Sequence, residues 1–314
     1  MRTIISKYFE DALFGFGDFL RGSLALKQES ELRGLDFGLD FSEHEIGNYI
    51  KSKKTGNTHG ISAKADFYMK FNRLQDFLDK KEIDTFNICS NSYHGDSCGL
   101  SVNESQEIFQ KHLEQQTISW FRENIYFSDE IVNQFNNRLS KNNIENYELI
   151  HFRIGDDHSF IKGEKGVLQH PRTRGKPPIL KEGFWPSFLK IILEKNKNNN
   201  NKILIICDSP KFKSEVKQSI LKAKAQNIFV LSGDAGHTSL AMLDKRFRNP
   251  DKRNLFETFF DLYTITKAKK ITSYCTYDFV SNFIRWPSII FNVKVDLFNF
   301  DDIVSIINKY ESKK

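Results

Sequence analysis

The sequence predicts an α/β protein in which short apolar strands alternate with amphipathic helices. From residue 146 onward, four β-branched apolar runs are separated by helical patterns, an arrangement typical of a parallel sheet. The 314 residues suit two domains of ordinary size. We therefore expect an N-terminal α/β domain over residues 1–145 and a C-terminal α/β domain over residues 146–314.

Glycines, caps and periodicity predict the elements of the first domain. A turn that contains Gly15 and Gly17 opens a helix over 18–26, and Asp18 is its expected N-cap. A capping-box pattern at 42–46 predicts the start of another helix. The other expected elements are strands over 35–41 and 85–89 and helices over 71–80, 105–124 and 129–139.

The second domain is predicted to repeat strand and helix. The expected strands are 149–152, 203–207, 228–231 and 270–274, and the expected helices are 186–194, 210–221, 255–267 and 277–284. The asparagine-rich tract 196–201 is interpreted as a solvated loop. Residues 159–182 are rich in Gly, Pro and basic side chains, which predicts a long loop near a functional site.

The segment 151–156 carries an imidazole, a guanidinium, a glycine and a carboxylate where the first of these strands ends. Such strand ends bind ligands in open α/β sheets. Arg153 offers a planar fork for phosphate oxygens, and Gly155 allows close approach of the backbone. We interpret the segment, with His151 and Asp156, as an anion-binding turn for a nucleotide diphosphate. The alternative is an ordinary turn in which Arg153 pairs with Asp156.

Three more groups are expected at the same edge, because parallel strands share one carboxyl edge. Asp208 and Ser209 follow the second strand, and His237 lies in a polar segment after the third. The fourth group opens a helix whose N–H groups suit an oxyanion, and consists of Ser273, Tyr274, Thr276 and Tyr277. The alternatives are helix caps and, for His237, an ordinary surface loop.

Charge, cysteine spacing and the length of apolar runs argue against a nucleic-acid-binding protein, a metal site and a membrane-spanning protein. The net charge of +6 agrees with a phosphate-bearing ligand, but basic and acidic residues are interleaved and no nucleic-acid motif occurs. The four cysteines, at 89, 98, 207 and 275, have no metal-ligand spacing, so we expect no metal site. No apolar run reaches the roughly 20 residues of a membrane span. We expect a cytoplasmic protein with no transmembrane segment, which leaves open a loose contact with a membrane surface.

Several motifs resemble those of the fucosyltransferase superfamily, which includes α-1,2-, α-1,6- and protein O-fucosyltransferases. Residues 151–156 look like its His-x-Arg-x-Gly-Asp motif, and 205–210 resemble the next family segment. The stretch 260–279 is similar to the third, and the early loop 15–22 to the family's glycine loop. The family's second arginine is replaced by Ile154, and residues 40–140 give no match.

The resemblance implies two Rossmann-like domains that face a cleft, the glycosyltransferase-B arrangement. It implies an inverting, metal-independent enzyme that needs no cofactor and transfers fucose from GDP-fucose to a glycan, glycolipid or lipid-linked oligosaccharide. Arg153 would neutralise the leaving diphosphate, with Asp18 as catalytic base. Donor contacts would come from Gly15, Gly17, Arg21, His151, Gly155, Asp156, Asp208, Ser209, His237, Ser273, Tyr274, Thr276 and Tyr277.

Two alternatives remain at this point. The same fold would also suit a glycosyltransferase that uses another nucleotide sugar. A protein that binds a nucleotide sugar without turnover is the second alternative, because the second arginine of the family is missing.

Overall fold

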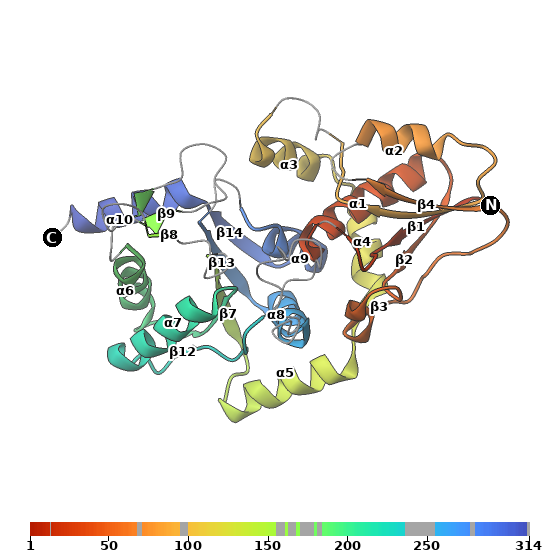
Figure 1. Cartoon of the computed structure of the whole chain (residues 1–314). Coiled ribbons are helices and arrows are strands. Elements are labelled where there is room, and N and C mark those ends of the chain that lie inside the picture. The colour runs from red at the N-terminus through yellow and green to blue at the C-terminus, as the bar shows by residue number, and fades with distance from the viewer. Residues whose placement is uncertain are drawn as a thin grey trace. The chain divides into compact units, whose positions relative to one another are not determined.

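The computed structural model describes residues 1–12, 14–67, 71–94, 100–154, 161–162, 168–169, 179–180, 184–235, 255–276 and 280–312. These residues form two compact units (Figure 1). The first unit contains 1–135, 282–292 and the described part of 236–263, and the second contains the rest. The expected single division after residue 145 assigns 255–263 and 282–292 to the second domain, whereas their packing assigns them to the first unit.

The first unit is built on a four-stranded parallel sheet in the order β2-β1-β5-β4. Its strands are β1 (Thr3–Lys7), β2 (Asp36–Asp40), β4 (Ser62–Phe67) and β5 (Thr85–Ser90). The structure confirms the expected strands at 35–41 and 85–89. Two strands are additional to those expected: β1, whose run Thr3-Ile4-Ile5 is β-branched, and the edge strand β4, whose side chains are mostly polar or small.

Helices surround this sheet, and a short antiparallel pair accompanies it. The elements are α1 (Phe16–Leu32), η1 (Glu45–Asn48), β3 (Ile50–Ser52), α2 (Phe71–Leu78), α3 (Val102–Lys111), α4 (Gln115–Asn124), β6 (Ile125–Phe127) and α9 (Asn282–Phe291). The single helix expected over 105–124 is two helices. The expected capping box is also wrong: His44 caps the single turn η1, and its Nδ1 accepts a hydrogen bond from the Ile46 N–H.

Helix α1 packs closely against α9. The N-cap of α1 is Gly15, so Asp18, the expected N-cap, lies instead in the first turn of the helix. A Cβ atom on Gly17 would lie 2.5 Å from the backbone carbon of Asn282 at the start of α9. Gly17 therefore allows two helix backbones from distant parts of the sequence to approach each other.

The second unit contains a five-stranded parallel sheet in the order β12-β11-β7-β13-β14. Its strands are β7 (Tyr147–Arg153), β11 (Lys202–Cys207), β12 (Ile228–Phe229), β13 (Lys270–Cys275) and β14 (Lys294–Phe298). Three of the expected strands are confirmed, the strand expected over 228–231 is present only over 228–229, and β14 is additional. Within the expected loop 159–182, three two-residue strands pair antiparallel: β8 (Ile161–Lys162), β9 (Leu168–Gln169) and β10 (Ile179–Leu180).

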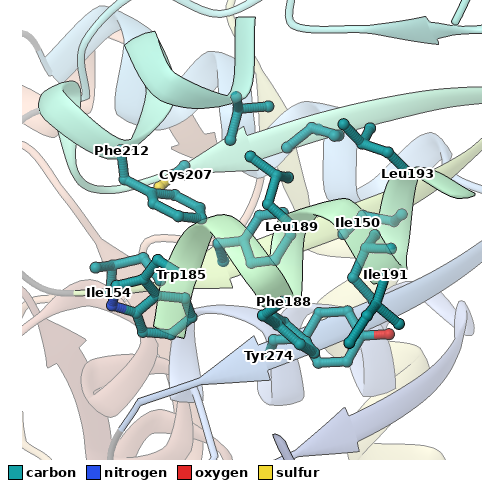
Figure 2. Close-up of a cluster of buried hydrophobic side chains, with 14 of the residues drawn as sticks. Ile150, Ile154, Trp185, Phe188, Leu189, Ile191, Leu193, Cys207, Phe212 and Tyr274 are labelled. Carbon is teal, nitrogen blue, oxygen red and sulfur yellow. The ribbon is translucent and has the colours of Figure 1, made fainter. Parts of the chain in front are cut away.

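One face of the second-unit sheet is covered by α6 (Phe184–Asn196), α7 (Pro210–Ala223) and α10 (Phe300–Glu311) (Figure 1). Figure 2 shows part of their shared core, in which Phe188 of α6 packs on Tyr274 and Phe212 of α7 lies near Cys207. The helices α5 (Asp129–Lys141) and α8 (Leu255–Lys267) each contain a boundary between the units. The Tyr147 hydroxyl donates to the Thr264 carbonyl at 2.7 Å, which ties α8 to β7.

Candidate functional site

The carboxyl edge of the second-unit sheet brings together Arg153, which ends β7, and Asp208, which follows β11. The Arg153 guanidinium forms an ion pair with the Asp208 carboxylate. The other carboxylate oxygen of Asp208 accepts the backbone N–H of Ile154 at 2.8 Å. Because β7 and β11 are neighbours in parallel register, residues 55 positions apart in sequence meet here. Asp208 thus fixes both the guanidinium and the backbone of the turn that follows it.

Among the described residues predicted for this edge, Arg153 and Asp208 are partly exposed to solvent. Their side chains are 27% and 17% exposed. By contrast, the other described candidates in the second unit are buried, with 5% exposure or less: His151, Ser209, Ser273, Tyr274 and Thr276. The described edge therefore has one outward-facing cation, oriented by a carboxylate, above a layer of buried polar side chains.

His151 lies in that buried layer and bonds across the sheet to Ser273. Its Nδ1 is 2.8 Å from the Ser273 Oγ, and the two residues are register partners on β7 and β13. Burial lowers the pKa of His151 from 6.5 to about 3, with a further lowering by the Arg153 charge and an opposing effect of Asp208. The imidazole is therefore neutral near pH 7, and it positions Ser273 rather than carrying a proton.

Thr276 joins the ends of β13 and β7. Its backbone N–H donates to the Arg153 carbonyl at 3.0 Å, and its hydroxyl lies 3.2 Å from the carbonyl oxygens of Arg153 and Ile154. Ser209 caps α7, and its Oγ accepts the Phe212 N–H at 3.2 Å. Both residues thus build the edge, with their hydroxyls engaged in the protein's own hydrogen bonds.

Tyr274 lies in the hydrophobic core and not in the layer of buried polar side chains. Its ring stacks on Phe152 and Phe298 in the core that Figure 2 shows, and burial raises the pKa of its hydroxyl to about 12. The reason is the alternation of side chains along a strand: Ser273 faces His151, so its neighbour Tyr274 must face the core. Its ring is therefore not available to a ligand at this edge.

Lys213 is a member of this edge that sequence reasoning missed. It lies in the first turn of α7, it is 2% exposed, and its Nζ donates to the Gly233 carbonyl beyond β12. The neighbouring Ser232 is 3% exposed, and its Oγ has no hydrogen-bond partner among the described residues. A lysine in a helix normally indicates a solvated face, so no signal in the sequence marks this one.

The predicted residues of the early glycine loop lie in the first unit. Arg21 is 3% exposed, and its Nε and Nη2 both donate to the Asn91 carbonyl, at 3.1 and 2.8 Å. The Oδ1 atom of Asp18 lies 3.3 Å from Arg21 Nη1 and accepts a hydrogen bond from Asn282 Nδ2 at 2.8 Å. Gly17 serves helix packing, as described above, and Gly15 caps α1.

Four predicted donor-site residues lie outside the described residues: Gly155, Asp156, His237 and Tyr277. Among the described residues, no group of three His, Cys, Asp or Glu side chains is placed to hold a metal ion. In that same part of the chain, no helix is long and apolar enough to cross a membrane.

Comparison with known proteins identifies relatives by fold. No protein-family model and no curated protein sequence matches the chain. Among solved structures, FUT1 of Arabidopsis thaliana in complex with GDP matches with a TM-score of 0.52 at 7% identity, over 94% of this chain and 69% of that one.

Two further solved structures match with lower scores. The NodZ α-1,6-fucosyltransferase, soaked with GDP-fucose, covers 92% of each chain at 10% identity, with a TM-score of 0.47. POFUT1 in complex with GDP covers 95% of this chain and 98% of that one at 13% identity, with a TM-score of 0.44. The likeness to FUT1 shows the fold alone: this protein has an α/β fold with parallel sheets like that of FUT1.

Proposed function

We propose that this protein is a glycosyltransferase that transfers fucose from GDP-fucose. The observation that carries the proposal is the Arg153–Asp208 pair at the carboxyl edge of a parallel sheet, where such folds bind nucleotides. The likeness to a fucosyltransferase in complex with GDP supports the same donor. The acceptor in this proposal is a glycan, glycolipid or lipid-linked oligosaccharide, and the setting is polysaccharide biosynthesis in the cytoplasm.

Arg153 is the proposed electrostatic catalyst. As the bond between fucose and the diphosphate breaks, negative charge grows on the leaving phosphate oxygens, and a fixed guanidinium stabilises that charge. Asp208 holds the guanidinium and the following N–H in place before the donor arrives. Pre-organisation of this kind lowers the reorganisation needed in the transition state. Arg153 already supplies positive charge to the phosphate, so the proposed reaction is independent of metal.

Asp18 is the proposed base for the acceptor hydroxyl in an inverting displacement. Its side chain is 30% exposed, and both of its described contacts, from Asn282 and Arg21, involve Oδ1. The Oδ2 atom has no partner among the described residues, so it can accept a proton. In the proposed step this oxygen takes the acceptor proton while the acceptor oxygen attacks the anomeric carbon of fucose.

A thermal-shift panel tests the donor. We expect GDP and GDP-fucose to raise the melting temperature, and UDP and UDP-sugars to have no effect, because only the folded state binds the ligand. Arg153→Ala should abolish the response. Lys270→Ala is the matched control, since it removes an exposed cation at the opposite end of the same sheet and should leave the response intact.

Each other outcome excludes part of the proposal. Stabilisation by UDP compounds alone would exclude GDP-fucose as donor. Stabilisation by GDP-fucose without release of fucose to water or to any acceptor would favour a protein that binds nucleotide sugars without turnover. No response to any nucleotide would exclude the diphosphate site at Arg153.

A further inference from the structure

The first unit buries a guanidinium that has one unpaired N–H donor. Arg285 of α9 is 4% exposed, and its Nη1 donates to the Gln106 Oε1 at 3.3 Å. Its Nε is fully buried and has no hydrogen-bond partner in the described part of the chain. Arginine carries five N–H donors, and buried donors are paired in the great majority of cases. Arg285 is therefore an exception that needs an explanation.

A second buried arginine increases the positive charge at this place. Arg21 is 3% exposed and lies over the Tyr93 ring, with its guanidinium carbon 4.5 Å from the ring centroid. Burial lowers the pKa of Arg285, the Arg21 charge lowers it further, and the nearby Glu107 and Tyr93 act against this. Arg21 is satisfied by Asn91 and Asp18, whereas Arg285 has no ion pair with a described carboxylate.

Aromatic rings pack in the core beside the helix that carries Arg285. The ring of Tyr93 lies 5.4 Å from that of Phe109, which lies 5.5 Å from the ring of Trp286, the residue after Arg285. Trp286 is fully buried, and the Tyr93 hydroxyl bonds to the Ser105 Oγ at 2.6 Å. In such surroundings an unpaired cation is costly, and an anion that pairs with it is held strongly.

A purely structural role does not account for Arg285. An apolar side chain of similar length would fill the same volume at lower cost, since replacing buried ionic groups by apolar ones is often neutral or stabilising. Groups that reduce stability in this way typically belong to functional sites. The missing element is a negatively charged group.

We propose that Arg285, supported by the charge of Arg21, is the centre of an anion-binding site in the first unit. The ligand is a carboxylate or phosphate group, because two oxygens of such a group match the parallel N–H donors of a guanidinium. Two sources supply this chemistry: an acidic sugar in the acceptor, or the diphosphate of the donor. Nothing in the Arg153 site requires this second cation, so the two sites are tested separately.

The test measures melting temperatures at constant ionic strength with sodium glucuronate, sodium phosphate and GDP as probes. Wild-type protein should melt at least about 2 °C higher with a saturating anionic probe. Arg285→Met, which keeps the length but removes the charge, should lose that rise and should melt no lower than wild type without ligand. Arg122→Met is the control, because Arg122 of α4 is half-buried and its Nε is satisfied by the Ile290 carbonyl at 2.7 Å.

The probes separate the two sources. A glucuronate or phosphate response that survives in Arg153→Ala but not in Arg285→Met assigns the site to an acidic acceptor. If GDP is the only probe that stabilises the wild type, and both Arg153→Ala and Arg285→Met lose this response, the ligand of the site is the donor diphosphate. A glucuronate response without any GDP response would exclude the proposed function and leave this site standing. The proposal is overturned if no probe stabilises the wild type, if Arg285→Met responds as the wild type does, or if that variant melts far lower without ligand.

Discussion

Arg153 and Asp208 show how a single side chain acquires a defined direction. A guanidinium at the end of a strand is free to rotate, but here one carboxylate holds both the guanidinium and the next backbone N–H. Arginine after an apolar strand is visible in sequence, and so Arg153 was predicted. Its partner was not predicted, because the pairing depends on the register of β7 against β11, which no local pattern encodes.

Replacing Arg153 by lysine tests the importance of this geometry. Arg153→Lys keeps the charge but replaces a planar fork by a single ammonium, which cannot satisfy Asp208 and a phosphate in the same arrangement. We expect the rate of fucose transfer to fall by about 100-fold or more, as for loss of a pre-organised donor to the transition state. Steady-state release of GDP measures it. A rate within a few-fold of wild type would mean that Arg153 acts by charge alone.

The buried His151 makes stability depend on pH. Its pKa is about 3 in the folded protein and 6.5 in an unfolded chain, so only the unfolded state takes up this proton between those values. Stability is therefore unaffected above pH 6.5 and is lost as the pH falls. Between pH 7.5 and pH 5 the loss due to His151 is about 2 kcal/mol.

Urea unfolding at pH 7.5 and pH 5 checks this dependence. In His151→Asn, the side-chain amide takes the place of the imidazole Nδ1 and can still hydrogen-bond to Ser273. The amide does not titrate. We expect the variant to lose about 2 kcal/mol less than wild type between the two pH values. Equal losses in both proteins would show that His151 is protonated in the folded state.

At the scale of elements, apolar and alternating runs predicted most strands of both sheets, but the buried strand β1 and the edge strands β4 and β14 were not predicted. β11 is apolar because strands flank it on both sides and most of its side chains are buried. The strands β4 and β14 lie at sheet edges and mix charged residues with small or apolar ones, which makes them harder to recognise. Tyr274 was assigned to the site because sequence alone does not tell which face of β13 is lined by the core.

The contact between α1 and α9 yields a prediction at this scale. Gly17→Ala would bring a methyl group to 2.5 Å from the Asn282 backbone, so the helices must separate. We expect a loss of about 1–3 kcal/mol in the free energy of unfolding, the usual cost of overpacking. Chemical denaturation measures it.

Gly34→Asn serves as the control for this substitution. Gly34 has φ of +62°, no atom lies within 4 Å of the place that a Cβ would occupy, and asparagine tolerates that backbone conformation. This variant should lie within about 0.5 kcal/mol of wild type, as most surface substitutions do. Equal stability of the two variants would show that the contact between α1 and α9 can accept a methyl group at position 17 without loss of stability.

At the scale of the whole molecule, the two units do not correspond to two halves of the sequence. Length predicted two domains, but the helix α9 comes from the last tenth of the chain and packs in the first unit against α1 and α4. Its Ile284, Trp286 and Ile290 are fully buried. Sequence periodicity marks α9 as amphipathic but does not tell which sheet or helices it covers.

This arrangement predicts the behaviour of a fragment. Residues 1–145 alone lack α9 and the start of α8, and therefore expose the apolar surfaces that these helices cover. We expect the fragment to show no cooperative thermal transition by circular dichroism, in contrast to the full chain. A cooperative transition near the melting temperature of the full chain would show that residues 1–145 form an independent domain.

The late position of α9 also affects how the protein folds during synthesis. A ribosome releases the chain from its N-terminus, and domains that are contiguous in sequence fold as soon as they emerge. The first unit cannot complete its core until residue 292 has left the exit tunnel, long after the strands of its sheet have emerged. Until then, apolar side chains of its sheet and of α1 stay exposed. We therefore expect chaperones that bind apolar surfaces to bind the nascent chain.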